Sequence, residues 1–258
     1  MGLERIQSND LAQWIRDDTD SLLTLEDPDW RGNFVSHCIP PIFAAYCKLF
    51  HPIYTDDSVA ADSGSWAAAD DTPETMGRLV SVSTDSGPHG RRVRWRELAD
   101  KYGRQFHPEF NETSLVQVFP DNSWPRSLLG PDEGSLDTPT CRRLIDALQP
   151  FTGDATCFFH YDVIATRRCE SDVAFRGKLH DSIHCCDDDD VHASPTHWWP
   201  ADRDWLVCTD WDLKFTLVGG SSELIARLLA DDELECIAVT PETRIDFRSD
   251  QLNSQKGI

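Results

Sequence analysis

Hydrophobic residues recur at helical spacing in several stretches of the chain, and the segment after Ser221 shows this most clearly. Ser221 suits the N-cap position, because its hydroxyl can accept a hydrogen bond from the first helical turn. The apolar face of that helix carries Leu224, Ile225, Leu228 and Leu229. The same spacing predicts further helices at residues 11–25, 41–50, 95–102 and 138–148.

Shorter runs of aromatic and β-branched residues, bounded by turn residues, predict strands. These runs lie at residues 79–83, 92–95, 115–119, 156–164, 205–209, 214–218 and 234–239. A hairpin is expected between residues 79–83 and 92–95, and Asp210, Trp211 and Asp212 suit a second hairpin turn. The C-terminal order β-β-α-β favours an α+β fold, with a mixed or mainly antiparallel sheet and helices packed on one face.

The polar stretches predict one globular α+β domain over residues 1–248, which could divide into sub-lobes at 1–135 and 136–248. Loop insertions are expected near residues 55–77 and 176–197, and a frayed tail at 249–258. The longest apolar run, residues 39–47, is far shorter than the roughly 20 residues that cross a bilayer. No secretory signal precedes it, and the nine cysteines are an odd number, so we expect a reducing, cytoplasmic location and no membrane partner.

The sequence resembles a group of uncharacterised bacterial proteins, best known from actinobacteria. The residues that carry this resemblance are spread along the chain and lie at 39–41, 50–52, 93–95, 133–136, 198–200, 202–203, 205, 212, 216, 218–221, 224–225, 228–229, 231 and 234–235. The segment from 166 to 191 departs from that pattern. The resemblance supports a globular protein, and it implies no activity or cofactor.

The formal charge of −21 comes from 45 acidic residues against 24 basic ones. It argues against a nucleic-acid or anionic-membrane partner, because both require clustered lysine and arginine to neutralise phosphates. A basic protein would be attracted instead. Two interpretations are open, since acid excess also arises as a salt or solubility adaptation without any partner. The sequence does not indicate an oligomeric state.

Histidines and cysteines gather in the segment from 180 to 197 and give a candidate metal site. Imidazole and thiolate are ligands that zinc prefers, and His180 and His184 would share one face of a helix. The candidate ligands are His180, His184, Cys185 and Cys186. The alternative is an exposed acidic loop, because the spacing lacks the paired cysteines of a structural zinc site.

Acidic and aromatic residues in the same region give a candidate partner-binding surface. The candidates are Asp187, Asp188, Asp189, Asp190, Trp198 and Trp199. Tryptophan is enriched at binding hot spots, but it also fills protein cores. Both interpretations of the two tryptophans are open.

No motif assigns a catalytic residue or an organic cofactor, and whether the protein is an enzyme is open. His160 and Asp162 share one face of a predicted strand, and Cys157 lies on the other face. The function favoured is a non-catalytic protein-binding role, such as an inhibitor or immunity-type protein with an acidic surface. The alternative is a metal-dependent enzyme that uses the segment 180–197.

Overall fold

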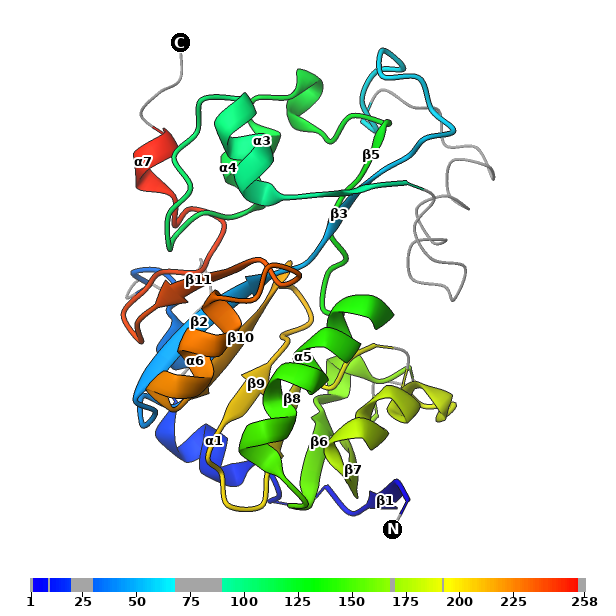
Figure 1. Ribbon diagram of the computed structural model, residues 1–258, viewed down its shortest axis with the longest axis vertical. Coiled ribbons are helices and arrows are strands. Elements are labelled where there is room, and N and C mark those ends of the chain that lie inside the picture. Colours follow the sequence, from blue (N-terminus) through cyan, green and yellow to red (C-terminus); the bar gives the residue numbers. More distant parts are fainter. Residues whose placement is uncertain are drawn as a thin grey trace.

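An eight-stranded antiparallel sheet forms the larger part of the molecule (Figure 1). The structure is a computed structural model that describes residues 2–8, 10–19, 30–67, 90–167, 170–191 and 193–254. The strand order is β1-β7-β6-β8-β9-β10-β2-β11. The bounds are β1 Glu4–Ile6, β2 Ala45–Phe50, β6 Cys157–Tyr161, β7 Val173–Gly177, β8 His197–Pro200, β9 Leu206–Cys208, β10 Phe215–Gly220 and β11 Cys236–Val239.

Helices α5 (Thr138–Thr152) and α6 (Ser222–Leu229) lie against one face of this sheet, as Figure 1 shows. The other face packs against α1 (Gln13–Asp18) and the 3-10 turn η1 (Val35–His37). Because side chains alternate along a strand, Trp198 enters the core beneath α5 and α6 and Trp199 the core beneath α1. The predicted α+β class is confirmed, with the longer helices on one face.

A second, three-stranded sheet with the order β4-β3-β5 lies beyond the end of β2. Its core is aromatic, with Phe50, Trp95, Phe110 and Trp124 in contact. The bounds are β3 Ile53–Thr55, β4 Arg92–Val93, β5 Leu128–Leu129, α3 Trp95–Lys101, α4 Glu112–Val116 and η2 Pro120–Asn122. The remaining elements are η3 Val163–Ala165, η4 Leu179–Asp187 and α7 Gln251–Ser254.

The predicted helix at 41–50 is wrong, because residues 45–50 form the strand β2. This strand lies between β10 and β11 and is buried almost throughout, so its residues do not show the alternation of a half-exposed strand. Even Lys48 is buried, and its Nζ donates hydrogen bonds to the carbonyls of Pro108 (2.5 Å) and Phe110 (2.7 Å).

Two segments that were predicted as strands overlap helices in the structure. Residues 115–119 overlap α4, which Asn111 caps by accepting a hydrogen bond from the N–H of Ser114. Strand β4 ends at Val93 and α3 begins at Trp95, because the carboxylate of Glu235 accepts the N–H groups of Trp95 (2.9 Å) and Arg96 (2.8 Å). The predicted strand at 79–83, and with it the first hairpin, lies outside the described residues.

The C-terminal prediction is largely confirmed. Strands β9 and β10 form the antiparallel hairpin, Ser221 caps α6, and β11 follows. However, β11 pairs with β2 and not with β10. The tail is not frayed at its start, since Ser249, Asp250 and Asn253 are buried and bond to residues 105–111.

The division at residue 135 does not match the sheets, because β1 and β2 share the large sheet with strands from the second half. The segment 176–197 is not a peripheral insertion. It begins in β7, runs through η4 with Leu179 and Cys185 in the core, and ends at β8. No helix within the described residues combines the length and the apolar character needed to span a membrane.

Candidate functional site

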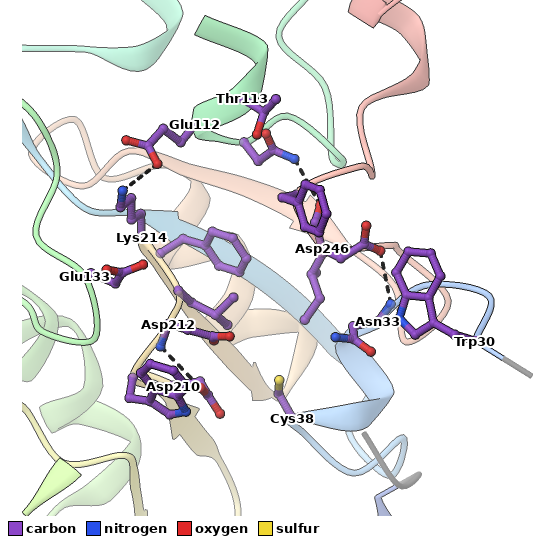
Figure 2. A pocket seen from close by; sticks show the side chains of 16 residues that line it. Trp30, Asn33, Cys38, Glu112, Thr113, Glu133, Asp210, Asp212, Lys214 and Asp246 are labelled. Carbon is purple, nitrogen blue, oxygen red and sulfur yellow. Dashed lines mark hydrogen bonds and ion pairs between the residues drawn. The ribbon is translucent and has the colours of Figure 1, made fainter. Parts of the chain in front are cut away.

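One candidate site is a hollow of about 570 Å³ on the same face of the large sheet as α1. It lies between the β9–β10 turn, the start of α4 and the segment 245–247. Figure 2 shows Asp210, Asp212 and Glu133 along one wall, and Asp246, Asn33 and Trp30 along the other. Its volume is typical of pockets that hold a small molecule or a long side chain, which run from about 300 to 1,000 Å³.

The β9–β10 turn brings Asp210, Trp211 and Asp212 to the pocket. The turn closes where the N–H of Leu213 donates to the carbonyl of Asp210 (3.1 Å). Gly134 packs so tightly on the backbone of Trp211 that a Cβ there would lie 2.6 Å from its carbonyl oxygen, and its φ of +67° also favours glycine. The Trp211 side chain stays 50% exposed at the rim.

The charges lining the pocket are unbalanced. Its side chains include five carboxylates and one lysine: Glu112, Glu133, Asp210, Asp212, Asp246 and Lys214. Lys214 pairs with Glu112 at 2.5 Å, and Asp246 pairs with Arg244. Among the described residues, no lysine or arginine forms a salt bridge with Glu133, Asp210 or Asp212. The pocket therefore carries a surplus of acid.

The two aspartates of the turn interact with each other. Burial, followed by a hydrogen bond with Asp212, raises the pKa of Asp210 to about 7. The N–H of Asp212 also points at the carboxylate of Asp210 (3.5 Å). At neutral pH the pair readily holds a proton, and a cation entering the pocket would favour its release.

The opposite wall offers an acceptor and aromatic surface. The side-chain Oδ1 atom of Asn33 is buried and has no hydrogen-bond partner in the described part of the chain. The backbone N–H of Asn33 donates to the carboxylate of Asp246 (3.1 Å). Phe247 is 52% exposed, and Trp30 and Phe215 also line the hollow. Such a wall can receive an N–H donor beside an aromatic ring.

A second cluster lies on the same face of the sheet as the pocket. His160 of β6 and His197 of β8 are paired in register, and Asp162 follows β6. One ligand atom from each of these three side chains lies within 4.8 Å of the other two. Burial lowers the pKa of His160. Burial also lowers the pKa of His197 to about 4, although a hydrogen bond with the backbone of Cys38 acts in the opposite direction. The His197 ring is therefore neutral at pH 7.

The predicted zinc ligands do not form this cluster. His180 and His184 have side chains that are 68% and 59% exposed, and they lie beside Asp181 and Asp187. Cys185 is fully buried in the core beneath α5, so it faces away from solvent. The side chain of Cys186 lies outside the described residues. Within those residues, the cluster that could hold a metal is His160, Asp162 and His197.

The predicted partner surface is also revised. Trp198 and Trp199 are 0% and 2% exposed, because β8 is central in the sheet and its two faces are both covered. Asp188 and Asp190 pair with Arg5 of β1, whereas Asp187 and Asp189 are exposed. Among the described residues, the exposed tryptophan beside carboxylates is Trp211, in the predicted hairpin turn.

Comparisons of the chain with protein-family models, with curated proteins and with solved structures found no match.

Proposed function

We propose that this protein is a binding protein that receives a cationic group of a basic protein partner in the acidic pocket beside Trp211. The observation that carries the proposal is the wall formed by Asp210, Asp212 and Glu133, which faces a hollow without a lysine or arginine salt bridge among the described residues. A guanidinium or ammonium group there would gain charge-assisted hydrogen bonds in a partly buried setting. The net charge of −21 supports the same choice of partner.

The aromatic rim strengthens this choice of ligand. Trp211 and Phe247 are each about half exposed at the mouth of the pocket, where their rings could stack on a cation or on the stem of an arginine. One arginine of the protein already makes a cation–π contact in this region, since the guanidinium of Arg244 lies 5.2 Å from the centre of the Trp30 ring.

The test is binding of a labelled arginine-rich peptide to two double variants of equal charge. D210N/D212N changes the pocket, and D187N/D189N changes exposed aspartates of the loop far from the turn in the sequence. The comparison is made well above pH 7, where Asp210 is ionised, so that each variant removes two negative charges and weakens long-range attraction by a similar amount. Removing carboxylates that contact the cation should cost a further factor of about ten or more in Kd.

Free arginine amide serves as a second probe, because it carries the same cationic group without a protein. W211A should weaken binding of either probe by several-fold. If both double variants bind the peptide equally well, the cation is held by the diffuse acidic surface and the pocket is not its site. Binding of the amide as tight as that of the peptide would assign the pocket to a small molecule and contradict a protein partner.

A further inference from the structure

We infer that His160, His197 and Asp162 form a binding site for one divalent transition-metal ion of the zinc type. This site is separate from the pocket of the proposed function, although Cys38 lines that pocket and its backbone also contacts His197. Two imidazoles and one carboxylate are a common ligand set for such ions.

The first argument is the state of the two imidazole rings. The Nδ1 atoms of His160 and His197 are both buried, and neither has a hydrogen-bond partner among the described residues. His160 is fully buried. A buried polar atom without a partner is unfavourable, so two such atoms on neighbouring, paired strands indicate a ligand that binds both.

The second argument is the tautomer of His160. Its Nε2 lies 3.1 Å from Asp172 Oδ2, and the other oxygen of Asp172 accepts the N–H of Val163 at 3.0 Å. The carboxylate therefore holds the proton on Nε2 and leaves the lone pair on Nδ1. A carboxylate behind a histidine is the usual support for a metal ligand, because it fixes the ring and makes it more basic.

The third argument is distance. Ligand atoms on a tetrahedral ion with bonds of about 2.0–2.1 Å lie about 3.4 Å apart. His160 Nδ1 and Asp162 Oδ1 are 3.4 Å apart, and the three ligand atoms all fall within 4.8 Å. Small side-chain movements would bring the set to bonding distance. The Asp162 side chain is 37% exposed, so the ion has a route from solvent and room for a water ligand.

The local charge also favours a cation. Arg16 on α1 lies 3.8 Å from Asp172, and its side chain is 46% exposed. One guanidinium therefore faces the two carboxyl groups of Asp162 and Asp172, so acidic groups outnumber basic ones at the site. A divalent ion would balance this excess.

The experiment is titration of the full chain, after dialysis against a chelator, with Zn²⁺ and separately with Co²⁺. We expect one ion per chain, visible absorption bands from bound Co²⁺, and a higher Tm with Zn²⁺, because an ion that binds only the native state stabilises it. D162N should weaken Zn²⁺ binding at least tenfold while leaving the fold intact, since this side chain is partly exposed. D172N, at a positioning residue, should weaken it about 10–100-fold.

H180Q/H184Q is the matched control, because it removes two exposed histidines from the segment that the sequence first suggested. We expect it to change Zn²⁺ affinity less than twofold, whereas H160Q/H197Q abolishes saturable uptake. The inference is overturned if the full chain takes up no stoichiometric ion. It is also overturned if H180Q/H184Q removes the uptake and D162N does not. A failure of the peptide test leaves these results unchanged, since the variants differ.

Discussion

The buried carboxyl group of Asp210 makes the stability of the folded protein depend on pH. The hairpin turn holds its carboxyl beside Asp212, and burial raises its pKa to about 7. In the unfolded chain the same carboxyl group ionises at its ordinary pKa of about 3.8. Between these values the folded protein binds more protons than the unfolded chain does, so this group makes the fold less stable as pH rises from about 4 to above 7.

We predict that D210N removes part of this pH dependence. The wild type should lose free energy of unfolding between pH 5 and pH 8, and the variant should lose less, by on the order of 1 kcal/mol after solvent screening is allowed for. Urea unfolding at the two pH values measures the difference. D189N, at an exposed carboxylate, is the control. An equal pH dependence in D210N and the wild type would show that Asp210 ionises normally in the fold.

Helix α6 packs on the large sheet through one apolar face. Leu224, Ile225 and Leu228 are buried against β2, β10 and β11, whereas Leu229 is 40% exposed at the end of the helix. The sequence placed all four leucine and isoleucine residues on one face. The structure separates them, since Leu229 is the last residue of α6 and is partly exposed.

This difference gives a test with two neighbouring, chemically equal substitutions. L228D should destabilise the protein by about 4 kcal/mol or more, because it removes a buried leucine and places an unpaired charge in the core. L229D should cost about 1 kcal/mol or less, and R227A should also do little. Thermal unfolding of the three variants measures this. Similar losses for L228D and L229D would mean that the buried face of α6 is misassigned.

At the scale of the whole molecule, the charge of −21 acts at long range on any partner. We predict that a basic protein partner associates several-fold more slowly as ionic strength rises, because salt shortens the reach of this field to about 8 Å at physiological ionic strength. Stopped-flow measurement of association over a salt series checks this. If the acid excess is only a salt adaptation, salt should raise the Tm and no specific complex should form with a basic protein from the native host.

The sequence by itself was sufficient for the fold class and for elements stabilised by their own residues. Periodicity predicts both α5 and α6, and the predicted cap Ser221 does cap α6, whereas α5 is capped by Asp137 and not by Thr138, the cap that the sequence suggests. The β9–β10 hairpin is likewise local. Such elements depend on contacts between residues a few positions apart, and their signal is therefore present in the order of the residues.

Tertiary structure alone decided β2, the cap of α3 and the buried tail. The apolar residues of β2 could equally have formed a helix face, and only pairing with β10 and β11 selects a strand. Glu235 caps α3 from 140 residues away. The candidate sites follow the same rule. The sequence showed His160 and Asp162 on one face of a strand, but His197 joins them only because β8 pairs with β6, and nothing in local spacing records that pairing.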